Sequence, residues 1–356
     1  MTLIIAEAGV NHNGNTEVAY KLIDAAYNAG ADIVKFQTFK AIKLASESAV
    51  QADYQVANTK KKESQVDMLT RLELPYSIHH ELIDYCNELG IEFLSTAFDS
   101  ESLQFLVQDL GLKRLKIPSG DITNAPLVLE HAQTGCDVIV STGMSTLAEV
   151  EQALGVIAYG YLNPDSKAPS ELLFQQAYSS EEGQFLLKTK VTLLHCTTEY
   201  PAPLPEINLR VMDTLAKAFK VRTGYSDHSV GITVPIAAAA RGAVVIEKHF
   251  TLDKNMDGPD HKASLEPDEL KQMVVAIREV EVALGSGIKA PSFSEIKNKS
   301  IARKSLVAKV NISKGDIFTK GNLTTKRPGG GSSPYQYWST LGTTADKMYK
   351  KDELIL

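Results

Sequence analysis

The chain has 356 residues, a formal net charge of −6, 44% hydrophobic residues and 22% charged residues. These values are typical of a globular protein with a sizeable core, and the length indicates one large domain with a smaller one. Basic residues form only short patches and no apolar run approaches the length of a membrane span, so we expect neither nucleic acid nor a membrane as a partner.

Cysteine usage favours a reducing compartment. The three cysteines, Cys86, Cys136 and Cys196, are odd in number and show no paired spacing. Neither a disulfide framework nor a zinc cluster is therefore indicated. Because the N-terminus also lacks a recognisable secretion signal, we expect a cytoplasmic protein.

Eight segments rich in apolar and β-branched residues are predicted to be strands. They are Leu3–Val10, Asp32–Gln37, Glu92–Thr96, Arg114–Ile117, Asp137–Ser141, Val191–His195, a segment ending at Ser226 and a segment ending at His249. Each is followed by a helix-like segment, as in parallel strands joined by right-handed crossovers. This order predicts a closed (β/α)8 TIM barrel. An open doubly wound sheet is the alternative, but no G-x-G-x-x-G turn follows the first strand.

Two long stretches interrupt this alternation of strands and helices. Residues 40–75 follow the second strand and are rich in Lys, Ser and Gln. They lie on the side where a barrel keeps its active site, so we expect them to cover the substrate. Residues 160–190 lie between a helix and the next strand, on the opposite face, where a structural or interfacial role is expected.

The domain boundaries follow from the end of the last amphipathic helix. Residues 1–285 are predicted to form the barrel, and residues 286–300, which contain Gly, Pro and Ser, are predicted to be a linker. Residues 301–356 contain short β-type runs and the turn Pro328–Gly331. This piece is too small to be very stable alone, so we expect it to dock on a partner surface.

The predicted carboxyl ends of the strands, where a barrel carries its chemistry, hold many polar residues. Lys35 and Lys116 lie there together with several serine and threonine hydroxyls. Ammonium groups supply charge and hydroxyls supply directed hydrogen bonds, so this combination predicts a site for a phosphate, a carboxylate, or both on one molecule.

Two histidines, His228 and His249, each lie where a predicted strand gives way to a loop. Imidazoles with oxygen donors nearby suit a divalent cation such as Mn²⁺, Mg²⁺ or Zn²⁺, which would polarise a carbonyl group. His12 and His195 are further candidates, so periodicity alone leaves the choice of ligands open. For each of them a buried, hydrogen-bonded histidine is the alternative interpretation.

Taken together, the motifs resemble the sialic acid synthase family, which comprises phosphoenolpyruvate-dependent N-acetylneuraminate, legionaminate and pseudaminate synthases. The motifs are Ala6–Gly14, Val34–Thr38, Lys116–Asp121, Ser141–Met144, His195–Thr197, Ser226–His228, Gly258–Asp260 and Lys326–Gly331. The resemblance covers essentially the whole chain. It implies a (β/α)8 barrel followed by a small β-rich antifreeze-like (SAF, β-clip) domain, in a domain-swapped homodimer.

The resemblance also implies a reaction and a set of residues. Phosphoenolpyruvate, an N-acetylated hexose and water would give a nine-carbon 2-keto acid and phosphate. His228 and His249 would hold the metal, with Mn²⁺ expected before Mg²⁺ or Co²⁺, and Glu7 would orient or activate the attacking water. The residues implied for phosphoenolpyruvate are Lys35, Thr96, Lys116, Ser119, Ser141 and Ser226, and those for the sugar are Gln37, Asn58, Asp121, Tyr200 and Asp260, with Arg327 from the other subunit.

The acceptor sugar is less specified than the reaction. N-acetylmannosamine, which gives N-acetylneuraminate, is the first expectation. The Lys116–Gly120 and Thr198–Tyr200 patterns also occur in legionaminate synthases, which use 2,4-diacetamido-2,4,6-trideoxymannose, and Asp121 and Pro118 depart from residues common in the family. A phosphorylated acceptor is a third option.

Two other classes of protein are alternatives. A Schiff-base aldolase or lyase would use Lys116 or Lys35 as its nucleophile. A non-enzymatic binding or ice-interacting protein would fit the antifreeze-like domain. The ring of polar residues at the strand ends argues against the latter, because a protein that only binds would not need it.

Overall fold

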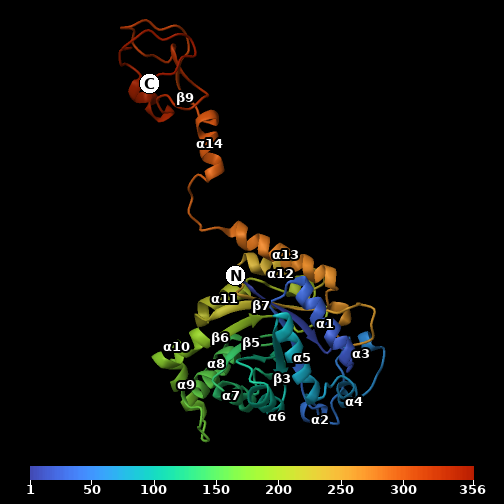
Figure 1. Cartoon of the computed structure of the whole chain (residues 1–356). Helices are drawn as coiled ribbons and strands as arrows, with labels where there is room; N and C mark the ends of the chain where they lie inside the picture. The colour runs from blue at the N-terminus through green and yellow to red at the C-terminus, as the bar shows by residue number, and fades with distance from the viewer. The chain divides into compact units, whose positions relative to one another are not determined.

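Eight parallel strands close into a barrel in the computed structural model, which describes residues 1–356 (Figure 1). Each strand is hydrogen-bonded to the next in chain order, and β8 returns to β1. The strands are β1 (Leu3–Gly9), β2 (Ile33–Thr38), β3 (Glu92–Ala97), β4 (Arg114–Ile117), β5 (Asp137–Ser141), β6 (Val191–His195), β7 (Arg222–Asp227) and β8 (Val245–His249). The predicted (β/α)8 fold is confirmed.

The interior of the barrel changes from apolar to polar along the strands. One buried cluster inside it consists of Ile5, Ile33, Leu94, Ile139, Leu194 and Val245. Because side chains alternate along a strand, the residue two positions later points into the same interior, nearer the carboxyl end. Those residues are Glu7, Lys35, Thr96, Ser141, Cys196 and Glu247. A layer of apolar side chains therefore fills the barrel, and a layer of mostly polar side chains lies next to it toward the carboxyl ends of the strands.

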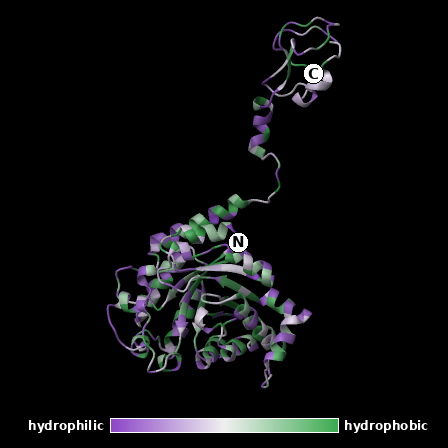
Figure 2. Ribbon diagram, turned by 180° about the vertical axis from the view of Figure 1, so that it is seen from behind, coloured by the Kyte–Doolittle hydropathy of each residue, from purple (hydrophilic) through white to green (hydrophobic).

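Helices surround the strands, and most of them carry both hydrophobic and hydrophilic residues (Figure 2). They are α1 (Thr16–Ala29), α5 (Tyr76–Leu89), α6 (Ser100–Gln104), α7 (Ala125–Gln133), α8 (Leu147–Leu162), α11 (Val211–Phe219), α12 (Thr233–Ala240) and α13 (Pro267–Leu284). α1 begins after Asn15, whose side chain accepts a hydrogen bond from the Val18 amide, and ends at Gly30 in the left-handed conformation. No helix of the chain is both long enough and apolar enough to cross a membrane.

The excursion after β2 forms three short helices, α2 (Ala41–Leu44), α3 (Asp53–Thr59) and α4 (Gln65–Thr70). A small apolar cluster that includes Phe39 and Met68 packs beneath them. Asn58 on α3 donates a hydrogen bond to the Pro259 carbonyl in the segment after β8, over 2.7 Å. The excursion is thereby tied to the loops at the carboxyl end of the barrel.

The second long stretch, between α8 and β6, is helical. It forms α9 (Glu171–Ser179) and α10 (Glu181–Lys190). Ser170 and Ser180 provide the helix caps, because each side chain accepts a hydrogen bond from the backbone of the first turn. Both helices pack on α8, where Gly155 approaches the Phe174 carbonyl closely.

The chain divides into two compact units, Met1–Gly285 and Ser286–Leu356. The second contains α14 (Phe293–Ala302), β9 (Ser305–Ala308), β10 (Leu323–Lys326) and α15 (Tyr337–Thr340). β9 and β10 pair antiparallel, and the unit has its own apolar core, which includes Leu306 and Phe318. α14 falls largely within residues 286–300, where we expected a linker. A capping box between Ser292 and Glu295 starts this helix.

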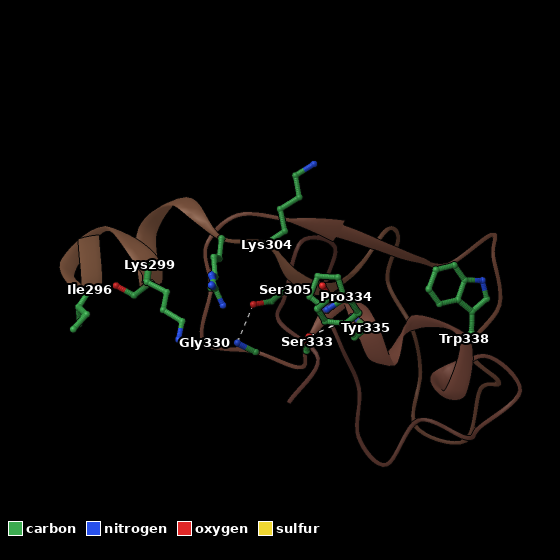
Figure 3. Close-up of a pocket in the computed structure, with 13 residues that line it drawn as sticks. Ile296, Lys299, Lys304, Ser305, Gly330, Ser333, Pro334, Tyr335 and Trp338 are labelled. Carbon is green, nitrogen blue, oxygen red and sulfur yellow. Dashed lines mark hydrogen bonds between the residues drawn. The ribbon is translucent and has the colours of Figure 1, made fainter. Parts of the chain in front are cut away.

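A cavity of about 880 Å³ lies within the second unit. Figure 3 shows Ile296 and Lys299 of α14 at one end and Trp338 at the other. The loop between them is glycine-rich, and the amide of Gly331 donates a hydrogen bond to the Ser305 hydroxyl over 3.0 Å. Tyr335 and Trp338 are largely exposed in this unit.

His131 on α7 makes stability depend on pH. Burial lowers its pKa to about 4, although its hydrogen bond with the Leu127 carbonyl opposes the shift. The unfolded chain binds this proton below about pH 6.5, and the folded chain does not until about pH 4, so stability falls as the pH drops between them. When the pH is lowered from 7 to 4.5, the free energy of unfolding should fall by about 2–3 kcal/mol more in the wild type than in the His131→Leu variant.

Urea denaturation of the barrel transition at the two pH values measures this difference. The His80→Leu variant, which changes an exposed histidine on α5, serves as the control and should follow the wild type. Equal losses in the wild type and in His131→Leu would contradict the assignment to His131.

Candidate active site

The two predicted lysines lie inside the barrel and contact two carboxylates. Lys35 Nζ lies 2.6 Å from Glu7 Oε2 and 3.6 Å from Glu247 Oε2, and it donates to Thr96 Oγ1 over 3.1 Å. Lys116 Nζ donates to Ser141 Oγ over 2.7 Å and lies 3.6 Å from Glu247 Oε1. All these side chains are buried. The structure thus brings Lys35, Thr96, Lys116 and Ser141 together around Glu247.

Glu247 is the central residue of this cluster, and the residues implied by the resemblance did not include it. Its Oε1 accepts a hydrogen bond of 2.7 Å from the Ser226 hydroxyl, which places Ser226 in the same network. The sequence carried a signal for it, because Glu247 lies two positions before His249 and so faces the same side of the strand.

The two carboxylates have opposite electrostatic behaviour. Burial raises the pKa of Glu7 to about 7, and the Lys35 ammonium only partly offsets this. Burial also acts on Glu247, but Lys116 and Lys35 outweigh it and lower its pKa to about 2. Glu247 Oε2 is buried without a hydrogen-bond partner, whereas Glu7 Oε2 contacts the Lys35 ammonium. One carboxyl group can therefore exchange a proton near neutral pH, while the other stays ionised between the lysines.

Ser119 lies beside a tightly packed glycine. Its hydroxyl accepts a hydrogen bond from the Gly143 amide over 3.0 Å and contacts Cys196 Sγ at 3.1 Å. A Cβ atom on Gly143 would lie 2.3 Å from Thr198 Oγ1, so no side chain fits at this position. Thr198 Oγ1 is itself buried without a partner. Backbone and hydroxyl groups can approach a ligand closely here.

The rings of His228 and His249 lie 5.5 Å apart between centroids. The Nδ1 atom of His228 lies 2.6 Å from the Thr197 carbonyl, to which it can donate, and this leaves Nε2 as the acceptor. The Tyr200 hydroxyl lies 3.1 Å from that Nε2 atom, and its ring stacks on His228 at 4.1 Å. His249 Nδ1 is buried without a hydrogen-bond partner, and Asp260 Oδ2 lies 3.8 Å from it.

The histidine pair fits a divalent cation. Burial lowers the pKa of His228 to about 4 and that of His249 well below its usual value, so both rings are neutral, as metal ligands must be. No group of three or more His, Cys, Asp or Glu side chains is arranged to hold a metal ion. A cation bound by these two rings would therefore keep open positions for water or substrate.

The other two candidate histidines have structural partners. His195 Nε2 lies 2.7 Å from the Ile207 carbonyl. His12 Nδ1 accepts a hydrogen bond from the Gly14 amide over 2.9 Å, and burial lowers its pKa to about 3. Of the four candidates, the structure places only His228 and His249 ring against ring.

Several residues implied for the sugar lie around this pair. Gln37 Nε2 donates to Glu7 Oε1 over 3.4 Å. A Cβ atom on Gly9 would lie 3.2 Å from Glu7, 3.4 Å from Gln37 and 3.5 Å from His249. Gly9 thus leaves open the space that these three side chains share.

The remaining sugar residues differ in how they are placed. The side-chain amide of Asn58 donates a hydrogen bond to the Pro259 carbonyl, next to Asp260. Asp121 accepts a hydrogen bond from Asn124 over 3.1 Å and has no direct bond to the lysine or histidine clusters. Arg327 is exposed and belongs to the second unit. Tyr54 on α3 was not predicted, yet it stacks on Tyr200 with ring centroids 5.2 Å apart.

Comparison with known proteins places this site in a family. The chain is 52% identical over 354 residues to the N,N'-diacetyllegionaminic acid synthase of Campylobacter jejuni, covering 99% of this chain and 98% of that protein. It is 44% identical to the N,N'-diacetyllegionaminic acid synthase of Legionella pneumophila, covering 96% of this chain and 89% of that protein.

A solved structure agrees with this relationship. The N-acetylneuraminic acid synthetase of Leptospira borgpetersenii superposes with a TM-score of 0.67 at 31% identity, covering 83% of this chain and 90% of that chain. A model of the NeuB family matches residues 22–289, and a model of the SAF domain matches residues 303–356. The chain therefore belongs to the NeuB family and carries a SAF domain at its C-terminal end.

Proposed function

We propose that this protein is an N,N'-diacetyllegionaminic acid synthase. It would condense phosphoenolpyruvate with 2,4-diacetamido-2,4,6-trideoxymannose and water, and release phosphate. The 52% identity to the Campylobacter jejuni enzyme over nearly the whole of both chains carries the choice of acceptor. N-acetylmannosamine, our first expectation from the sequence, becomes the second candidate, because the sialic acid synthetase with a solved structure is only 31% identical.

The class of reaction follows from the family. Proteins of the NeuB family are phosphoenolpyruvate-condensing nonulosonic acid synthases, so the chain is an enzyme of this class. The reaction forms a bond between C3 of phosphoenolpyruvate and the aldehyde carbon of the open-chain sugar. Water adds to C2, and the C2–O bond to phosphate then breaks.

The buried lysines support binding of phosphoenolpyruvate. Its phosphate and carboxylate would replace the longer contacts that Lys35 and Lys116 make with Glu247. Hydroxyls in and beside the same network would donate to the ligand oxygens, namely those of Thr96, Ser119, Ser141 and Ser226. Two ammonium groups in a closed site stabilise both the bound anion and the departing phosphate.

Glu7 is suited to orient the attacking water. Its raised pKa, about 7, allows it to accept and return a proton under neutral conditions. Its Oε1 is held by Gln37 and its Oε2 by Lys35, so the carboxyl group has one orientation. A water placed between Glu7 and C2 of phosphoenolpyruvate would lose its proton to this carboxylate as the new C–O bond forms.

His228 and His249 would hold a divalent cation, with Mn²⁺ as the first choice. When bound, such a cation supplies Lewis-acid polarisation of the aldehyde oxygen. Tyr200 and Asp260 contact the two imidazoles and would orient the sugar beside them. The aldehyde carbon is thereby presented to the phosphoenolpyruvate held by the lysines.

The SAF domain is proposed to complete the site of a second subunit in a domain-swapped homodimer. Residues 286–356 contain 13 lysine or arginine residues and only five aspartate or glutamate residues, so this unit is basic whereas residues 1–285 are acidic. Opposite charges favour association between the SAF domain of one copy and the barrel of another. Arg327, exposed on the SAF domain, would then reach the partner's sugar.

Acceptor choice is the first test. Phosphate release with phosphoenolpyruvate should be at least about tenfold more efficient, as kcat/KM, with 2,4-diacetamido-2,4,6-trideoxymannose than with N-acetylmannosamine, because a site that binds both acetamido groups leaves polar groups unpaired with the simpler sugar. Higher efficiency with N-acetylmannosamine would reject the proposed acceptor.

Borohydride treatment with pyruvate should leave the protein unlabelled, whereas a Schiff-base enzyme would be labelled.

Removal of a metal ligand is the second test. His228→Ala should abolish phosphate release at all Mn²⁺ concentrations while keeping a cooperative circular-dichroism melting transition, since His228 lies beyond the last residue of β7 and takes no part in strand pairing. His80→Ala, at an exposed position, is the matched control and should retain activity. Turnover of His228→Ala at saturating Mn²⁺ would refute the ligand assignment.

Complementation between subunits tests the swapped dimer. Arg327→Ala should raise the acceptor KM with little change in the KM for phosphoenolpyruvate, because the arginine would contact only the sugar. Mixing unfolded Arg327→Ala and His228→Ala chains and refolding them together should restore turnover at a low acceptor concentration, at which neither variant alone is efficient, since one site of each hybrid dimer is then intact. Failure of the mixture to recover activity would argue against sites built from two chains.

A further inference from the structure

We propose that the buried ion pair between Asp227 and Lys248 is a positioning device that sets the separation of the imidazoles of His228 and His249. Each member of the pair precedes one of the two histidines by a single residue. The inference rests on the proposed function, in that it assumes that the two histidines hold a divalent cation.

The pair is isolated from solvent and does not face the substrate. Lys248 Nζ lies 2.5 Å from Asp227 Oδ2, and both side chains are 0% exposed. The register of β7 and β8 places Ser226 opposite Glu247 and Asp227 opposite Lys248. Because side chains alternate along a strand, Ser226 and Glu247 point into the barrel and the ion pair points out toward the helices.

The residue after each member of the ion pair is a histidine, and by the same alternation its side chain points into the barrel. β7 ends at Asp227, so His228 lies just beyond the last residue of its strand, whereas His249 is the last residue of β8. No strand pairing therefore holds His228 beside His249. The ion pair is the last link between the two strands on the outer side, one residue before the imidazoles.

The turn after His228 is attached to the same pair. Asp227 Oδ1 accepts hydrogen bonds from the Ser229 amide over 3.1 Å and from the Ser229 hydroxyl over 2.8 Å. Lys248 Nζ donates to the Ser229 carbonyl. Asp227 is thus held by Lys248, and Ser229 is bonded to both, so the residues on either side of His228 are fixed. The backbone that carries the imidazole has little freedom to move away from His249.

Stability alone does not explain two fully buried charges. The desolvation of an ammonium and a carboxylate offsets most of their attraction, and uncharged replacements of similar size are often as stable. An ion pair does, however, favour one register of β7 against β8, since a shift of one strand along the other would separate the two buried charges. For a cation held by only two protein ligands, this geometry determines the affinity.

The test uses the full-length protein and two double variants. In Asp227→Asn/Lys248→Met, both charges are removed together, the side-chain sizes are kept, and the asparagine can still accept the hydrogen bonds of Ser229. The control, Asp32→Asn/Arg278→Met, removes the ion pair of 2.7 Å between Asp32, which directly precedes β2, and Arg278 of α13, at the opposite end of the barrel. Calorimetric titration with Mn²⁺, the visible spectrum with Co²⁺ and the thermal unfolding of each protein are measured.

We expect the first double variant to unfold near the temperature of the wild type, to bind Mn²⁺ about tenfold to a hundredfold more weakly, and to show a changed Co²⁺ spectrum. The control should bind both ions as the wild type does. Wild-type affinity and spectrum in Asp227→Asn/Lys248→Met would overturn the positioning role. If the wild type binds no metal, or if His228→Ala binds as tightly as the wild type, the metal assignment itself fails and the inference fails with it.

Discussion

Closure of eight parallel strands into one barrel is the constraint on which the rest of this structure depends. Closure sends every second side chain of each strand into a shared interior, so that residues far apart in the sequence meet. The apolar set that includes Ile5 and Val245 fills the lower interior, and the residues two positions further along form the polar site. A shift of one residue in any strand would exchange a site residue for one that packs on the helices.

The positive and negative charges of the polar interior balance each other. Two ammonium groups and two carboxylates are buried within contact of one another, with Glu247 between Lys35 and Lys116. Charges in such a place are held by their partners rather than by water, and a ligand anion can exchange for those partners. The same balance separates the two carboxyl groups, because Glu7 has one lysine near it and a raised pKa while Glu247 has two and a lowered one.

The histidine end of the site depends on neighbouring strands in a different way. Ser226 and Glu247 tie β7 to β8 inside the barrel, and Asp227 and Lys248 tie them outside. The histidines follow immediately beyond these two ties. Short sequence motifs around each histidine therefore carry both the groups proposed for chemistry and the groups that position them, on alternate faces of the same strands.

The sequence by itself determined the architecture and most of the candidate site. Eight apolar segments separated by segments of helical periodicity predicted the barrel. The polar residues near the carboxyl ends of these segments predicted Lys35, Lys116, His228 and His249 as candidate site residues. It did not identify the cap of α14 within the expected linker, the central place of Glu247 or the stacking of Tyr54 on Tyr200. Those features depend on strand register and on contacts between segments distant along the chain, which only tertiary packing decides.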